Sequence, residues 1–490
     1  MTKRNTERKL AAAVVASGLA LWAQDPLRYS VPTPRPINPA ESTTNPSAIA
    51  TQRQNPYLGS VPEKATGATI ELTLRAAIER GLRYNLGLVE SNQASADVRA
   101  ARLRALALLL PQISGRGRQG FENLSLREIG LRAIPGVGPL PPTTGNFAYQ
   151  DARVALSQTV YDAQLRHEYR SQKEAEQASL LTAKDSRDVV VFAAGAAYMQ
   201  AIASAARVET AKAQVASAAE LDQQTASRVK SEVSPEIDSL RAQVERQSAG
   251  QRLADAENQL EKDKLTLGRI IGFGVDQKFA LADSLSHRAL AALTSASATE
   301  EALRTRADLA SAEASLRSAE SSLRAERAQR LPVVTFAADY GGGGSNLGNF
   351  NQLYSISGNV TVPLYTGGRI RADIEQARAE LERRRAEYED LKGRVAYDVR
   401  VAWLDVAASE SSVQVAGRNK ALAERALVES QDRYTNGVTN FLEVVQGREA
   451  VAIAEDNYTA SLYSLDVAKI ALARAMGSAE TRIAELLGGK

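Results

Sequence analysis

The stretch "YSISGNVTVPLYTGGRIRADIEQ", Tyr354–Gln376, changes its pattern halfway along. In its first half apolar and polar residues alternate, which predicts a strand over about residues 354–364. One face of this strand would carry Tyr354, Ile356, Val360 and Val362, and the other face serine, asparagine and threonine. The second half turns at two glycines and becomes a charged helix. A wholly apolar strand face needs a covering, and the rest of the sequence indicates what covers it.

Three other segments alternate in the same way, over about residues 112–122, 148–160 and 333–340. In the last of these, Val334 and Phe336 fall on the apolar face. In the first, the opposite face carries arginines. Strands of about 9–11 residues, apolar outside and charged inside, fit a membrane β-barrel with a wet lumen. The alternative is an antiparallel sheet with one face on a soluble core, but the strands sit at the ends of very long helices, where no such core is expected.

Long helical segments alternate with these strands, and the order recurs. Arg228, Val233 and Gly272 each have a counterpart 205 residues later, since 433 − 228, 438 − 233 and 477 − 272 all give 205. We therefore expect two repeats, residues 69–272 and 299–477, each reading helix, strand, strand, long helix, turn, helix. The predicted fold class is mainly α with a small membrane β-barrel portion. A plain coiled-coil rod is the alternative that the helices alone would allow.

The segments outside the repeats have simpler predictions. Basic residues precede an apolar run near the start, so residues 1–23 have the layout of a secretory signal peptide. Residues 24–68 are rich in proline and predict an extended linker. Residues 273–298 are expected to link the repeats, and residues 478–490 to form a C-terminal tail. No later segment holds 18 consecutive apolar residues, so no transmembrane helix is expected after the signal.

Composition excludes several classes of function. The chain has 490 residues, a net charge of +3 and no cysteine, which argues against nucleic-acid binding, disulfides, thiolate metal sites and a cysteine-linked lipid anchor. The two histidines, His167 and His287, lack a second ligand at useful spacing and are expected to be solvated. The run Gly341–Asn346 is interpreted as a flexible hairpin turn rather than a phosphate loop. We therefore expect no enzyme, no cofactor and no metal.

Four strands cannot close a barrel around a lumen, and an open sheet edge is not tolerated in lipid. The chain is therefore expected to oligomerise; a dimer would give eight strands and a trimer twelve.

At this point the sequence resembles a known family. The two-repeat order, "VPLYTGGRIRADIEQARAE" after the last strand and "RYTNGVTNFLEVVQGREA" from Arg433 resemble the TolC-type outer-membrane efflux channels. The resemblance implies a homotrimer: a twelve-stranded barrel in outer-membrane lipid, continuous with an α-helical tunnel across the periplasm. It also implies a membrane-fusion adaptor and an inner-membrane pump as partners.

Three functions remain open at this stage. The first is a passive exit duct for small molecules in a tripartite efflux pump. The second, on the same fold, is the outer-membrane component of a type I protein secretion system. The third, from another class, is a periplasmic coiled-coil adaptor or structural rod.

The resemblance also points to candidate site residues at the two far turns between helices. Asp238 and Glu443 occupy equivalent places just beyond the turns, where the family narrows its tunnel. Three copies of each would attract cations, although ordinary solvated helix acids are the simpler alternative. Tyr434 matches a tyrosine that helps to latch the closed tip. The expected turn and adaptor-contact residues are Val233, Ser234, Gly437, Val438 and Thr439, for which helix packing is the plain alternative.

Overall fold

A computed structural model describes residues 55–487, apart from residues 66, 128–132, 135–137, 289–292 and 346–349. The described residues fall in one compact unit, Arg53–Lys490. The predicted signal peptide and the predicted linker up to residue 54 lie outside the described residues.

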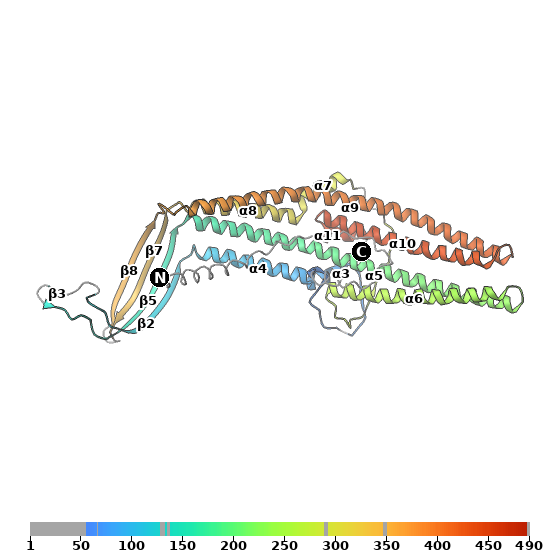
Figure 1. Cartoon of the computed structure of the whole chain (residues 1–490), viewed down its shortest axis with the longest axis horizontal. Helices are drawn as coiled ribbons and strands as arrows, with labels where there is room; N and C mark the ends of the chain where they lie inside the picture. The colour runs from blue at the N-terminus through green and yellow to red at the C-terminus, as the bar shows by residue number, and fades with distance from the viewer. Residues whose placement is uncertain are drawn as a thin grey trace, which may run out of the picture. The chain divides into compact units, whose positions relative to one another are not determined.

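In the described part of its first half, the chain forms short elements first, and then two long strands, β2 and β5, and two very long helices, α5 and α6 (Figure 1). In chain order the elements are η1 (Pro56–Leu58), β1 (Ile70–Leu72), α3 (Leu74–Tyr84), α4 (Leu86–Ala107), β2 (Gln112–Glu122), β3 (Ala133–Ile134), β4 (Gly138–Pro139), β5 (Phe147–Tyr161), α5 (Ala163–Lys230) and α6 (Glu236–Ile271).

The second half has the same order of main elements. They are β6 (Phe279–Leu281), α7 (Ser295–Thr305), α8 (Ala307–Ala328), β7 (Val333–Gly344), β8 (Phe350–Thr361), α9 (Arg369–Thr435), α10 (Phe441–Ala475) and α11 (Ala479–Leu487). Corresponding helices match in length: α3 and α7 have 11 residues each, α4 and α8 have 22 each, and α5 and α9 have 68 and 67. The molecule is thus mainly α-helical, as the sequence predicts.

The long strands form one antiparallel four-stranded sheet, in the order β2-β5-β7-β8, at one end of the helices (Figure 1). The strands differ from the predicted ones in two regions. Strand β7 continues through Gly344, so the interpretation of Gly341–Asn346 as a hairpin turn is wrong for Gly341–Gly344, while Asn346 lies outside the described residues. Strand β8 begins at Phe350, four residues before the predicted start, and ends at Thr361, so Val362 lies just beyond it.

Close approach of neighbouring residues explains the glycines in β7. A Cβ atom on Gly341 would collide with the carbonyl oxygen of Ala152 in β5. A Cβ atom on Gly342 would collide with the ring of Phe350 in β8. Only glycine fits such positions without moving the partner strands, so these residues are selected by packing and not by a turn.

Two predicted helices are each broken in two. The sequence predicts continuous helices over residues 69–110 and 299–330, but Asn85 and Arg306 adopt extended backbone between α3 and α4 and between α7 and α8. The buried Asn85 side chain accepts a hydrogen bond from the amide of Gly87 at 3.0 Å, which caps α4. Arg306 pairs with Asp308 at 2.5 Å and Asp398 at 3.2 Å. The two breaks lie 221 residues apart (306 − 85), the same distance that separates Pro111 from Pro332.

The helices pack side by side in a single layer on each side of the middle. Towards the sheet, α5 packs between α4 and α8, and α8 packs against α9. Towards the far turns, α5 packs between α6 and α10, and α10 packs against α9. The chain therefore has two unlike edges: one is formed by β2, α4 and α6, and the other by β8 and α9 (Figure 1).

The main core lies in the middle, where α3, α5, α6, α10 and α11 meet around the fully buried Tyr198. The hydroxyl of Tyr198 donates to the carboxylate of Asp283 at 2.7 Å. Helix α11 contributes Ala479 and Ile483 to this core, so the expectation of a plain C-terminal tail is wrong for these residues. The end of the predicted linker is likewise packed, because Tyr57 of η1 is only 7% exposed.

Helix α5 is long and apolar enough, by length and composition, to cross a membrane. A core helix of a folded unit meets the same criteria, so the expectation of no transmembrane helix after the signal stays a prediction. More than half of its apolar window (56%) is buried inside the unit, and Val190, Val191 and Ala194 of this helix are fully buried. Burial of this kind is what a core helix requires.

Candidate functional site

The four long strands place their apolar residues on one face of the sheet. In the β7–β8 register, Val334 lies opposite Val360, Ala338 opposite Ile356, and Tyr340 opposite Tyr354. Directly opposed residues share a face, and Phe336 lies on this face too. Strands β5 and β2 extend the same face through Val154 and Leu156, and through Ile113 and Phe121.

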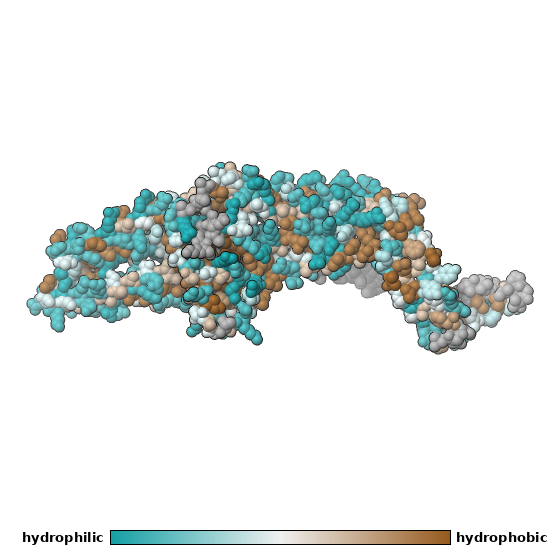
Figure 2. Space-filling view, turned by 180° about the vertical axis from the view of Figure 1, so that it is seen from behind, coloured by the Kyte–Doolittle hydropathy of each residue, from teal (hydrophilic) through white to brown (hydrophobic). Residues whose placement is uncertain are grey.

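This apolar face is strongly exposed in the single chain. Ile356 is 70% exposed and Tyr354 is 74% exposed. Apolar side chains gather over the part of the sheet next to the helices in the space-filling view (Figure 2). A large exposed apolar surface marks contact with a partner or a membrane, since water does not favour it.

The opposite face of the sheet is polar and charged. Arg153 of β5 pairs with Asp151 at 2.6 Å and with Asp339 of β7 at 3.3 Å. Arg116 and Arg118 of β2 lie on the same face, directly opposite Arg153 and Asp151. The sheet therefore separates an apolar side from a charged side, as the alternating pattern predicts.

The two far turns have the same backbone arrangement. The amide of Val233 donates to the carbonyl of Arg228 at 2.9 Å, and the amide of Val438 donates to the carbonyl of Arg433 at 2.8 Å. Gly437 takes a positive φ of 73°, whereas the equivalent position in the first turn is Glu232, with a φ of 60°. Val233 and Val438 are 64% and 67% exposed. Each turn thus presents an apolar side chain to solvent.

Tyr434 joins the two hairpins at the turns. Its ring lies edge-on to Phe441, with centroids 5.6 Å apart, and beneath the guanidinium of Arg228 at 5.0 Å. Its hydroxyl lies 3.4 Å from the Oγ of Ser234, which also accepts a hydrogen bond from Arg228 at 3.2 Å. Tyr434 and Phe441 belong to the α9–α10 hairpin and Arg228 and Ser234 to the α5–α6 hairpin, so this cluster ties the hairpins together.

The two predicted pore acids each have a cationic neighbour in their own hairpin. The carboxylate of Glu443 pairs with Arg433 at 3.1 Å and accepts a hydrogen bond from the hydroxyl of Thr439. Asp238 is only 8% exposed, and its carboxylate lies 3.8 Å from Arg241. The sequence pattern does not reveal the Arg433–Glu443 pair, because only the geometry of the turn brings residues ten apart face to face.

Other features do not form a catalytic or metal site in the described part of the chain. No group of three or more histidine, aspartate or glutamate residues there could hold a metal ion. His287 is exposed, as expected, and lies 2.7 Å from Glu410. For His167, burial and then the nearby Arg170 and Arg324 lower the pKa.

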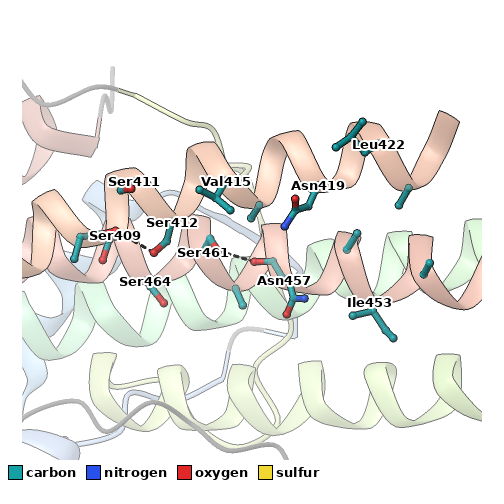
Figure 3. A pocket seen from close by; sticks show the side chains of 16 residues that line it. Ser409, Ser411, Ser412, Val415, Asn419, Leu422, Ile453, Asn457, Ser461 and Ser464 are labelled. Carbon is teal, nitrogen blue, oxygen red and sulfur yellow. Dashed lines mark hydrogen bonds between the residues drawn. The ribbon is translucent and has the colours of Figure 1, made fainter. Parts of the chain in front are cut away.

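A groove of about 1050 Å³ runs between α9 and α10 (Figure 3). Its lining mixes serines and asparagines, such as Ser409, Ser464, Asn419 and Asn457, with alanines and the larger apolar Val415, Leu422 and Ile453. Ser461 donates to the carbonyl of Asn457 at 2.7 Å, within its own helix. Nothing in this lining resembles a catalytic arrangement.

The geometry defines a class of protein: a bundle of very long helices that ends in a sheet with one apolar face and one charged face. Comparison with known proteins agrees with this class. Residues 298–478 match the family described as outer membrane efflux protein. Over 234 residues the chain is 25% identical to the pyoverdine export outer membrane protein OpmQ of Pseudomonas putida, covering 45% of this chain and 47% of that protein.

Solved structures share the fold. The Campylobacter jejuni CmeC outer membrane channel superposes with a TM-score of 0.71 at 16% identity, over 87% of this chain and 92% of that one. The outer membrane protein VceC from Vibrio cholerae gives a TM-score of 0.69 at 19% identity, over 82% and 96%. Residues 298–478 of the chain are therefore similar in sequence to the outer membrane efflux proteins, and the described unit shares the fold of outer-membrane channels. The match of the chain spans about half the length of the curated relatives.

Proposed function

We propose that this chain is the outer-membrane duct of a tripartite export system, through which small molecules leave passively. Three copies would close a twelve-stranded barrel in the outer membrane, continuous with a helical tunnel across the periplasm. The observation that carries the proposal is the pair of unlike edges that run the length of the described unit.

The sheet needs another chain at both of its edges. Strands β2 and β8 each have one neighbour in the sheet, so each leaves a row of backbone groups without a partner strand. Such an edge is not stable in lipid, where water cannot satisfy it. Pairing β8 of one copy with β2 of the next is a head-to-tail contact, which closes into a ring when the rotation between copies is a whole fraction of a turn.

The helical edges support the same ring. Exposed apolar residues follow one stripe of α6, and others follow one stripe of α9. These are Ile237, Leu240 and Val244 on α6, and Val415 and Leu422 on α9. Because α6 and α9 are the two outer helices near the turns, a ring would bring these stripes together and cover them.

The dimensions of the strands suit a membrane. Strands of 11 to 15 residues, at about 3.3 Å per residue and a tilt near 45°, rise roughly 25–35 Å. The side facing lipid would carry Val334, Phe336, Tyr354, Ile356 and Val360, with Val362 at its margin. Tyr365, which is 90% exposed beside the helices, suits the interfacial aromatic girdle of such barrels.

The hairpin turns would form the periplasmic tip. The exposed side chains of Val233 and Val438 suit contact with a periplasmic adaptor, which would connect the duct to an inner-membrane pump. The cluster around Tyr434 would latch the closed tip, with Ser234, Gly437 and Thr439 shaping it. Asp238 and Glu443 would lie at the narrowest level, and their pairing with Arg241 and Arg433 would weaken the cation preference of that level.

Small molecules are the cargo that the comparisons favour, because the similar OpmQ protein is named for pyoverdine export. A rod or adaptor without a barrel is disfavoured by the four-stranded sheet with its exposed apolar face.

The test combines three measurements on the full-length protein. We expect it in the outer-membrane fraction, migrating as a heat-modifiable oligomer on gels, and forming ion channels in planar bilayers. Deleting the gene should then raise intracellular accumulation of small-molecule cargo. A protein found only in the soluble periplasmic fraction, with no channel activity, would refute the proposal.

A further inference from the structure

Arg448 lies in the seam between the two hairpins, close to the tip. On α10, Phe441, Val444 and Arg448 follow one another at intervals of three and four residues and so share a helix face. Phe441 and Val444 are fully buried in a cluster with Leu221 of α5 and Ala242 of α6. The same face therefore carries Arg448 towards the first hairpin.

Arg448 is a cation without an ion pair in the described part of the chain. Its Nε is buried and has no hydrogen-bond partner. Burial lowers its pKa, while Glu245 of α6 and then Glu220 of α5 act in the opposite direction. Neither acid is free for it, since Glu245 pairs with Arg252 at 2.7 Å and Glu220 accepts a hydrogen bond from Gln224 at 3.3 Å. Arg448 is thus a half-buried cation, and its buried Nε has no compensating partner.

The first hairpin lacks such a cation. The position 205 residues earlier is Gln243, whose side-chain amide donates to the hydroxyl of Ser239 at 3.4 Å. An uncharged amide with a local partner costs little to hold there. The uncompensated charge is therefore a property of the second hairpin.

We infer that the charge of Arg448 weakens the packing between the two hairpins. This seam therefore stays closed only while the contacts of Tyr434 and Phe441 hold. A buried charge without a partner destabilises the arrangement that buries it. Separation of the hairpins relieves this cost, because water or the carboxylates of Glu220 and Glu245 then reach the guanidinium. The inference concerns the seam of one chain, and only its consequence for conduction rests on the proposed duct.

The test is hydrogen–deuterium exchange of the amides of α10 near residues 441–452 in the purified full-length protein. Arg448→Met removes the charge and keeps an unbranched apolar side chain. We expect about tenfold slower exchange than in the wild type, since replacing a buried, poorly compensated charge with an apolar group is commonly stabilising. The matched control is Arg425→Met, which removes an exposed arginine from α9 and should leave the exchange unchanged.

Two further variants test the same inference independently. Arg448→Gln removes the charge but keeps a polar amide, so it should also slow exchange, and it covers the case in which the methionine variant fails to fold. Tyr434→Leu should speed exchange, and adding Arg448→Met to it should restore part of the protection. Exchange that is unchanged or faster in both Arg448 variants would overturn the inference.

In bilayers, Arg448→Met should lower the open fraction. Absence of channels in every variant would count against the proposed duct and leave the exchange result intact.

Discussion

The sheet and the hairpin tips differ in whether their side chains find partners within one chain. At the sheet, charged residues pair on one face, while apolar residues such as Ile356 remain exposed on the other. At the tips, the aromatic Phe441 is fully buried between hairpins, and Glu443 pairs within its own hairpin. The sheet thus depends on surroundings that one chain cannot supply, whereas the tip is largely complete within one chain. Substitutions at the sheet should therefore act on assembly, and substitutions at the tip on gating.

The largest effect is expected for a charge on the apolar face of the sheet. Ile356→Arg should reduce assembly in the outer membrane, because an arginine on the lipid side near mid-bilayer costs about 2–4 kcal/mol. Ser357→Arg, one residue on and therefore on the opposite face, should assemble normally. The readout is the fraction of heat-modifiable oligomer in outer-membrane preparations. Equal loss in both variants would mean that the two faces do not have different surroundings.

A somewhat smaller effect is expected for a side chain added at Gly341, where β7 lies very close to the backbone of β5. Gly341→Val would push a Cβ into the carbonyl of Ala152, and overpacking of this kind costs about 1–3 kcal/mol or more. Gly358→Val is the control, because nothing lies within 4 Å of its Cβ position. We expect a lower temperature of oligomer dissociation for the first variant only. If Gly341→Val dissociates at the wild-type temperature, Gly341 is not held by packing between strands.

The smallest effect is expected at the tip acids. Because Arg433 pairs with Glu443, Glu443→Gln should change ion selectivity little, whereas Arg433→Gln should release the carboxylate and raise cation selectivity roughly twofold, in line with the modest strength of exposed ion pairs. Reversal potentials in a salt gradient measure this. A larger change for Glu443→Gln than for Arg433→Gln would show that the pair does not hold in the assembled protein.

Sequence pattern predicted the strands and their faces because the period of two is a local property. The register between β7 and β8 then brings together residues that the pattern had assigned to one face. The turn at Gly437 was also predictable, since its positive φ favours glycine.

The remaining features depend on contacts between distant segments. The glycines of β7 are explained only by the backbone of β5 and the ring of Phe350. The helix breaks at Asn85 and Arg306 have no proline signal, and tertiary partners hold both residues. Arg228 and Arg433 of the tip could be recognised in the sequence because they recur 205 residues apart. Their partners across the turns could not be recognised in this way.

Closure of several copies into a ring through their unlike edges underlies the whole proposed duct. Native mass spectrometry of the full-length protein, released from outer-membrane preparations in detergent, tests this closure most directly. We expect a mass of three chains, with no stable monomer while the detergent complex is intact. A mass of one chain or two chains, for protein that still forms channels, would contradict it.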